Sequence, residues 1–131
     1  MIFGIGTDIV QISRIESALE THGDRFAQRI LADTEMDEFN THPSKARYLA
    51  KRYAAKEAAA KAFGTGFTNG LRLKDLSVRN DERGRPVMQF FGVALEFIKG
   101  NKIEGHHLSL SDEKEYAIAY VVLESTDSKS N

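Results

Sequence analysis

The chain of 131 residues contains no cysteine and no tryptophan, and only two of its residues are proline. The lack of cysteine excludes disulfide bonds and thiolate metal sites. No run of 18 or more apolar residues occurs, so the sequence predicts no helix that could cross a bilayer. The N-terminus has no basic segment and no cleavage site of the secretory kind, and we therefore expect a cytoplasmic protein.

The residues that are present have the balance of one globular domain with a single core, at 41% hydrophobic and 28% charged. The net charge is −1, yet the segment 44–63 holds six Lys or Arg residues and one acid, Glu57. A local basic patch of this kind suits a small anionic ligand better than a long nucleic acid. A solvated helix face would give the same pattern.

Hydrophobic periodicity and chain-breaking residues predict an α+β domain, in which an antiparallel sheet wraps around one long helix and further short helices pack at one side. Helices are expected at residues 12–22, 24–32, 33–40, 44–63 and 93–99, and strands at 2–10, 73–80, 86–91, 106–111 and 116–124. Asp33 is expected to cap the third helix. Residues 1–124 are expected to form the domain and 125–131 a disordered tail.

The stretch GIGTDIVQI, residues 4–12, places an acid, Asp8, in what otherwise has the composition of a buried strand. The apolar residues around it are expected in the core: Met1, Ile2, Phe3, Ile5, Ile9, Val10 and Ile12. Gly4 and Gly6 are expected to allow another backbone to approach closely. A buried ionised carboxylate needs a partner, because its desolvation costs more than packing returns.

Glu57, on the predicted long helix, is a second acid in an apolar setting, and it also needs a partner for its charge. At about 100° per residue, it lies on the apolar stripe of the helix, in line with Tyr53 and Lys61. Each acid has an ordinary explanation, since Asp8 could cap the following helix and Glu57 could pair with Lys61. Two inward carboxylates together also suit Mg²⁺, which takes one or two protein carboxylates and completes its sphere with water and substrate phosphate oxygens.

Three blocks of sequence, GIGTDIVQISRIE, RYAAKEAAAKAFGTG and HLSLSDEKEYAIAYVVLE, together resemble the bacterial holo-acyl-carrier-protein synthases, in the order and spacing of that family. The resemblance implies transfer of 4′-phosphopantetheine from coenzyme A to a serine of apo-acyl carrier protein, with release of adenosine 3′,5′-bisphosphate, in fatty acid biosynthesis. It also implies dependence on Mg²⁺, and Mn²⁺ has the same preference for oxygen ligands.

By this resemblance, Asp8 and Glu57 bind the metal ion, and Lys61 contacts the phosphates and stabilises the leaving charge. The proton of the attacking serine would go either to Glu57 or to a metal-bound water, and both possibilities remain open. Coenzyme A would be bound by Lys61 together with Lys45, Arg52, Gly64, Gly66, His107 and Ser109. Backbone amides near the two glycines would approach a phosphate.

Arg52 points about 140° away from Glu57 on the helix, so one subunit would not easily present both to one ligand. The family's arrangement, a homotrimer with active sites between subunits, would resolve this conflict. Arg14 matches a family arginine that meets the acidic carrier protein. Arg25 and Arg29 would extend that basic surface, although they are equally compatible with solvated side chains.

Other functions fit the sequence less well. A hydrolase triad of His107, Ser109 and Asp112 is disfavoured, because neither Ser109 nor Ser111 lies in a G-x-S-x-G turn. The position of Asp112 often holds histidine in the family, which leaves its role open. A module that binds coenzyme A without transfer gains little from inward acids, and the net charge of −1 disfavours a nucleic-acid-binding domain.

Overall fold

The computed structural model describes residues 1–126. In chain order its elements are β1 (Ile2–Gln11), α1 (Ile12–His22), α2 (Asp24–Ile30), α3 (Asp33–Thr41), α4 (Lys45–Phe63), a short 3₁₀ helix η1 (Leu73–Asp75), β2 (Leu76–Asn80), β3 (Pro86–Phe90), α5 (Gly92–Gly100), β4 (Ile103–Asp112) and β5 (Tyr116–Ser125). Among these residues, no helix is long and apolar enough to span a membrane.

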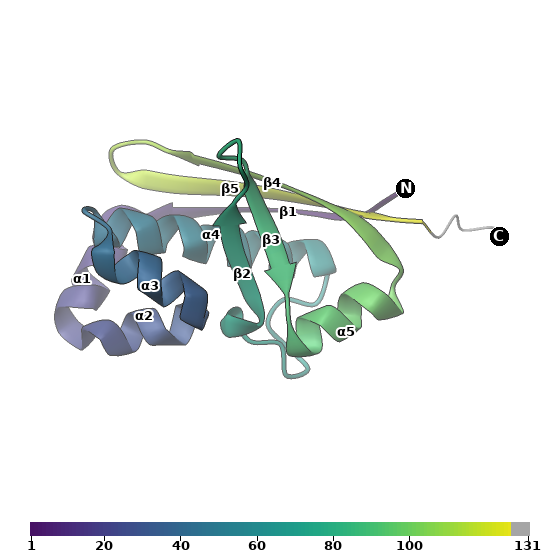
Figure 1. Cartoon of the computed structure of the whole chain (residues 1–131), viewed down its shortest axis with the longest axis horizontal. Helices are drawn as coiled ribbons and strands as arrows, with labels where there is room; N and C mark the ends of the chain where they lie inside the picture. Colours follow the sequence, from purple (N-terminus) through teal and green to yellow (C-terminus); the bar gives the residue numbers. More distant parts are fainter. Residues whose placement is uncertain (127–131) are drawn as a thin grey trace.

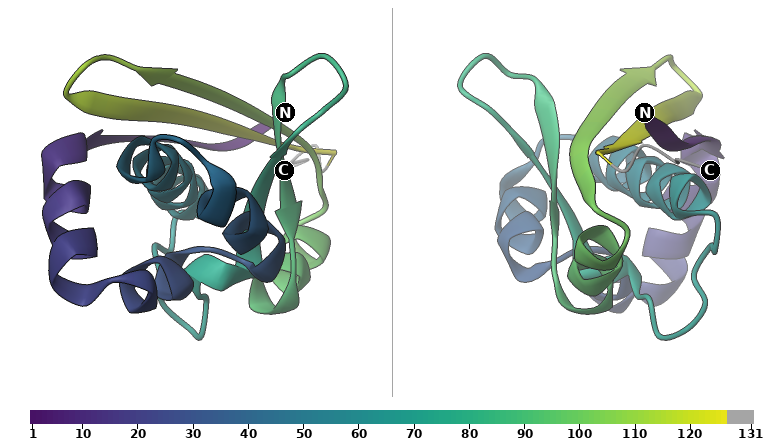
Figure 2. Two further views of the ribbon diagram at one scale, coloured as in Figure 1. Left: turned by 60° about the vertical axis from the view of Figure 1, so that its left-hand side comes forward. Right: turned by 90° about the vertical axis from the view of Figure 1, so that its right-hand side faces the viewer.

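Two antiparallel sheets enclose the long helix α4. One sheet has three strands in the order β1-β5-β4, and the other is the hairpin β2-β3. Helix α4 lies along the three-stranded sheet, with α1, α2 and α3 near one end of the molecule and α5 near the other (Figure 1; Figure 2 shows the same arrangement from two further directions). The predicted α+β fold, with a sheet around one long helix, is confirmed.

The contact between α4 and β1 is unusually close, because small residues meet there. Ala54, Ala58 and Ala62 of α4 are almost completely buried. A Cβ atom built on Gly4 would lie 2.0 Å from the carbonyl oxygen of Ala62, and one built on Gly6 would lie 1.9 Å from that of Ala58. The expectation that these two glycines admit another backbone is therefore confirmed, and this contact sets the distance between the strand and the helix.

Substituting Gly6 with alanine is therefore expected to lower the free energy of unfolding by at least about 2 kcal/mol, because the clash is with backbone and not with a flexible side chain. Urea denaturation followed by circular dichroism measures this. Gly100→Ala is the matched control, since the space around its Cβ position is open and the expected change is within about 0.5 kcal/mol. Equal midpoints for the two variants would contradict this account of the contact.

One expectation about the core is wrong. Ile2, Phe3, Ile5 and Ile9, expected in the core together with Met1, are exposed, and only Val10 and Ile12 of that group are buried. The reason is that β1 is covered on one face only. Its even-numbered residues from Gly4 onward face α4, while Ile5 and Ile9 lie on the opposite face of the sheet. Phe3 lies where the register of the strand shifts, and its ring packs edge to face against Phe97 of α5.

Four local predictions also need correction. Asp33 is the first residue of α3, so the capping position before it is held by Ala32 and not by Asp33. The backbone N–H of Ala32 donates to the Glu35 carboxylate at 2.9 Å. Residues 73–75 form η1, so β2 begins later than expected, and β4 begins at Ile103. Strand β5 continues to Ser125, whose N–H donates to the carbonyl of Met1 at 2.8 Å. Residues 127–131 of the predicted tail lie outside the described residues.

A buried ion pair that local sequence patterns do not predict joins four elements. The Lys56 ammonium of α4 donates to the Glu35 carboxylate and to the carbonyl of Ile30, both at 2.6 Å. The second oxygen of Glu35 accepts the backbone N–H of Val78 in β2 at 2.7 Å. Lys56 is 0% exposed and Glu35 is 1% exposed. Burial lowers the pKa of Lys56, and the charge of Glu35 opposes that shift.

His106 links the two sheets. Its Nε2 accepts the backbone N–H of Met88 in β3 at 3.1 Å, and its ring meets Phe90 edge to face. Burial lowers the pKa of His106 below its usual 6.5, with smaller contributions from His107 and Arg85. Only a neutral imidazole can accept this hydrogen bond, so the protonated ring loses the connection to β3.

The stability of the fold is accordingly expected to depend on pH through His106. The unfolded chain binds the proton first as pH falls, so the contribution is complete above pH 6.5 and is lost as pH decreases through the lower pKa of the folded state. Unfolding free energies measured at pH 7.5 and 5.5 should differ more in the wild type than in His106→Gln, which does not titrate. An equal difference in both proteins would show that other groups cause the pH dependence.

Candidate active site

Asp8 and Glu57 line the same cleft, although they are 49 positions apart in the sequence. The cleft has a volume of about 420 Å³ and lies where β1 ends, beside α1 and α4. Its lining comprises Asp8, Ile9, Val10, Gln11, Arg14, Ile15, Ala18, Phe26, Tyr53 and Glu57. Asp8 lies on the face of β1 that is turned toward α4, and both acids are half-buried. They border the core at a cleft and are not enclosed within it.

Neither ordinary explanation of the two acids holds in the structure. No side chain caps the start of α1, so Asp8 is not a capping residue. Lys61 forms its ion pair with Asp8, at 3.2 Å, and donates to the carbonyl of Thr7 at 2.9 Å. Lys61 itself is exposed. The side of α4 that carries Glu57 and Lys61 is therefore open to solvent near the C-terminal end of the helix.

The negative charge of Glu57 is only partly balanced by the other charges in the cleft. Burial raises the pKa of Glu57, and the negative charge of Asp8 raises it further. A hydrogen bond from Tyr53 and the charge of Lys61 act in the opposite direction on this pKa. A cation placed between the two carboxylates would relieve both the repulsion and the desolvation.

The donor set suits a hard divalent cation that is shared with a ligand. Two carboxylates are the number that Mg²⁺ commonly takes from a protein, with phosphate and water oxygens in its other positions. Across residues 1–126, no three His, Asp or Glu side chains converge in a way that would hold a metal ion by themselves. Asp8 and Glu57 therefore fit a magnesium site completed by a substrate, and not a closed structural site.

Arg52, predicted to bind coenzyme A, lies in a different pocket of about 380 Å³. It is 5% exposed, its guanidinium lies 4.5 Å from the centre of the Tyr48 ring, and one nitrogen is 3.6 Å from the Glu38 carboxylate. Within the described chain, its buried Nε has no hydrogen-bond partner. Lys45, at the start of the same helix, lies over the ring of Phe39 at 5.5 Å.

His107 and Ser109 are on the far side of the three-stranded sheet from Asp8. His107 of β4 is paired with Val122, and Ser109 with Tyr120, and all four side chains lie on the face turned away from α4. His107 contacts the Glu124 carboxylate at 2.7 Å. One chain therefore does not bring the predicted coenzyme A residues together around one ligand.

Gly64 and Gly66 end helix α4. Both have positive φ, 86° and 63°, and their amides donate to the carbonyls of Lys61 and Ala60 at 3.0 and 3.2 Å. The amides of these two glycines cap the helix in this structure, and their predicted approach to a phosphate stays a prediction. Their conformation still turns the chain directly after Lys61.

The three arginines predicted to meet a carrier protein are exposed on neighbouring helices. Arg14 is on α1 and also lines the cleft, while Arg25 and Arg29 are on α2. The open question about Asp112 is answered by contacts, because its carboxylate pairs with Arg47 at 2.7 Å and with Lys51 at 3.3 Å. Asp112 thus joins the β4-β5 hairpin to α4.

The basic residues of segment 44–63 do not form an open positive surface. Arg47 and Lys51 are paired with Asp112, and Lys56 is buried with Glu35. These three side chains are therefore less open to an anionic ligand or a nucleic acid than the composition of the segment indicates. An exposed arginine group is found instead at the β2-β3 turn.

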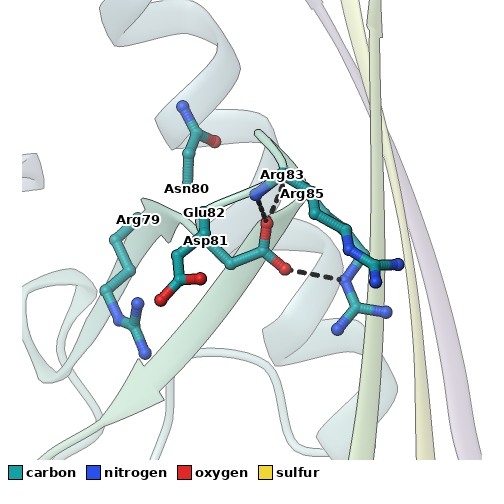
Figure 3. Close-up of a pocket in the computed structure, with 6 residues that line it drawn as sticks. All are labelled: Arg79, Asn80, Asp81, Glu82, Arg83 and Arg85. Atoms are coloured by element: carbon teal, nitrogen blue, oxygen red, sulfur yellow. Dashed lines mark hydrogen bonds and ion pairs between the residues drawn. The ribbon is translucent and has the colours of Figure 1, made fainter.

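This turn borders an open pocket of about 640 Å³, larger than the carboxylate cleft (Figure 3). Its lining is Arg79, Asn80, Asp81, Glu82, Arg83 and Arg85. The Asp81 carboxylate accepts the backbone N–H groups of Arg83 and Arg85, each at 2.9 Å, and these bonds hold the turn. None of the predicted site residues lies here, so size alone does not identify the active site.

Comparison with known proteins defines the class of the chain first. The model of the 4′-phosphopantetheinyl transferase superfamily matches residues 4–121, which include both sides of the carboxylate cleft. The holo-acyl-carrier-protein synthase of Halorhodospira halophila is 55% identical over 94% of this chain and 98% of that protein. The chain therefore belongs to the holo-acyl-carrier-protein synthase family, and it is an enzyme of that family.

Solved structures agree with this assignment. The holo-acyl-carrier-protein synthase of Neisseria meningitidis has a TM-score of 0.89 and 42% identity, covering 95% of this chain and 100% of the other. That of Bacillus anthracis, in complex with CoA (3′,5′-ADP), has a TM-score of 0.80 and 39% identity, covering 96% and 99%. The resemblance predicted from three sequence blocks is confirmed.

Proposed function

We propose that this enzyme transfers the 4′-phosphopantetheine group of coenzyme A to a serine of apo-acyl carrier protein in an Mg²⁺-dependent reaction. The observation that carries the proposal is the pair of half-buried carboxylates, Asp8 and Glu57, which share one cleft beside Lys61. A related enzyme has been solved with CoA (3′,5′-ADP). Fatty acid biosynthesis and a cytoplasmic location belong to the same proposal, since the family resemblance implies both.

In the proposed reaction, the serine oxygen forms a bond to the phosphorus that carries the pantetheine arm. The bond between that phosphorus and the bridging oxygen of the pyrophosphate breaks, and adenosine 3′,5′-bisphosphate leaves with the electron pair. The serine proton passes either to Glu57 or to a water molecule in the cleft. Phosphoryl transfer depends mostly on positioning and on stabilising charge, which suits a site made of acids and a lysine.

Asp8 and Glu57 would hold the metal ion, whose contribution when bound is to neutralise charge on the phosphate oxygens. Lys61, exposed at the edge of the cleft and 3.2 Å from Asp8, is placed to contact the same phosphates. Its point charge would stabilise the negative charge that develops on the leaving group. Arg14, Arg25 and Arg29, on α1 and α2 next to the cleft, would attract an acidic carrier protein.

We further propose that the active enzyme is a homotrimer with its sites between subunits. His107 and Ser109 border an exposed apolar area on the outer face of the three-stranded sheet. This area is formed by Ile5, Ile9, Ile118, Tyr120 and Val122. Burying it against another copy would remove apolar surface from water and carry His107 and Ser109 toward a neighbouring cleft.

Ile5→Asp tests the proposed assembly, because Ile5 is 68% exposed on this face and does not line the cleft. We expect the wild type to sediment as a trimer and Ile5→Asp as a monomer with little transferase activity. Leu95→Asp on α5 is the control, since it charges another exposed apolar residue. A wild type that is monomeric and fully active would overturn the assembly.

The reaction itself is tested by incubating the protein with apo-acyl carrier protein, coenzyme A and Mg²⁺, and weighing the carrier protein by mass spectrometry. We expect a mass gain of one phosphopantetheine, which is lost when a chelator is added. Binding of coenzyme A without any mass gain would indicate a binding module and would overturn the proposal.

A further inference from the structure

Gln11 and Tyr53 are the polar residues of the carboxylate cleft to which neither the sequence nor the proposed reaction assigns a role, and Tyr53 shares its helix with Glu57. Tyr53 precedes Glu57 by one helical turn on α4, so both side chains lie on the same side of the helix. Tyr53 lines the cleft together with Asp8, Glu57 and Arg14, and its ring is half-buried. A phenol in this place brings a hydrogen-bond donor to the two acids.

The surroundings of Tyr53 show where its hydroxyl group acts. Burial raises the pKa of Tyr53, and the next contributions come from the charge of Glu57 and a hydrogen bond with it, ahead of Asp8. In return, the hydrogen bond from Tyr53 lowers the pKa of Glu57. Because Tyr53 precedes Glu57 by one turn and lines the same cleft, its hydroxyl group lies on the same side of α4 as the Glu57 carboxylate. The nearby Arg14 charge favours the phenolate only weakly.

The two acids of the cleft therefore have separate donors. Asp8 is held by the Lys61 ammonium at 3.2 Å. Lys61 also donates to the carbonyl of Thr7 at 2.9 Å, which fixes it on the strand side of the cleft. For Glu57, the corresponding donor on its own helix is the hydroxyl group of Tyr53. A carboxylate that binds a metal ion through one oxygen commonly has its other oxygen held by such an outer hydrogen bond.

We propose that Tyr53 is a positioning residue, which donates its hydroxyl hydrogen to one oxygen of Glu57 and leaves the other oxygen directed toward a divalent cation shared with Asp8. This inference rests on the proposed function, because it assumes the metal-dependent use of the two acids. Tyr53 does not contact the reacting atoms in this account. It acts by reducing the number of orientations available to Glu57.

Tyr53→Phe tests the inference, since it removes the hydroxyl group and keeps the ring that packs in the cleft. Mn²⁺ binding to the enzyme with coenzyme A, followed by electron paramagnetic resonance, should weaken by about 10- to 100-fold. The Mg²⁺ concentration needed for half-maximal transfer should increase by a similar factor, while kcat at saturating Mg²⁺ changes much less. Thermal unfolding should be little affected.

Tyr116→Phe is the matched control, because it removes the hydroxyl of an exposed tyrosine on β5 that does not line the cleft. It should bind Mn²⁺ as the wild type does. Unchanged Mn²⁺ affinity in Tyr53→Phe, with or without reduced thermal stability, overturns the positioning role alone. A wild type that binds no Mn²⁺ in the presence of coenzyme A and shows no Mg²⁺-dependent transfer overturns the proposed function and this inference with it.

Discussion

Asp8→Asn and Glu57→Gln are each expected to reduce transfer of phosphopantetheine by at least about 10³-fold, since the metal-supported charge stabilisation that they would remove is worth several kcal/mol. The measurement is the initial rate at saturating coenzyme A and carrier protein, followed by mass spectrometry. Both substitutions keep the size of the side chain, so packing around the cleft is preserved.

These variants should stay folded. Burial and the charge of Asp8 raise the pKa of Glu57, so the ionised carboxylate destabilises the folded state at pH values above that pKa. Glu57→Gln removes this unfavourable charge, and its melting temperature should equal or exceed that of the wild type. Near-normal turnover in either variant would rule out the two-carboxylate site, whereas a loss of fold would mean that the acids support the structure.

Lys56→Met and Glu35→Gln are expected to have the largest effects on stability, about 3–5 kcal/mol each, because each leaves one charged group buried without its partner. The double variant should lose less than the sum of the two single losses, since neither charge then remains. Glutamine at position 35 can still accept a hydrogen bond from Val78 N–H through its amide oxygen. Chemical denaturation of the four proteins gives the coupling energy.

Lys51→Met serves as the control on the same helix. Lys51 pairs with Asp112 at 3.3 Å where both side chains are partly exposed, and a pair of this kind contributes about 0–1 kcal/mol. If Lys56→Met cost no more than Lys51→Met, the buried pair would not be what joins α4 to α3 and β2. Lys56 is the neighbour of Glu57 in the chain. The rate of transfer by Lys56→Met therefore also shows whether activity depends on the buried contact that fixes α4.

Local patterns were sufficient for much of the fold. Alanine and lysine between His42-Pro43 and Gly64 predicted the helix that the structure places at Lys45–Phe63. The two glycines of β1 predicted its close contact with that helix. Asp8 and Glu57 stood out because charged residues rarely occur in apolar settings, and the structure brings both to one cleft.

Local patterns failed where a residue's environment depends on distant parts of the chain. Ile5 and Ile9 have the composition of a core strand, but β1 is covered by α4 on one face only, and periodicity does not reveal which faces are covered. Glu35 and Lys56 are polar residues on predicted helices, and nothing within a few positions of either indicates that they meet in the interior.

Periodicity, breaker residues and charged residues in apolar segments were sufficient to predict the α+β class, the long helix and the two acids with Lys61. Helical periodicity also indicated that Arg52 and Glu57 point to different sides of α4. The separate positions of Asp8 and His107, on opposite faces of one sheet, became apparent from the strand pairing. The physical reason is that helix direction and sheet pairing, both set by long-range packing, determine which side of the molecule a side chain reaches.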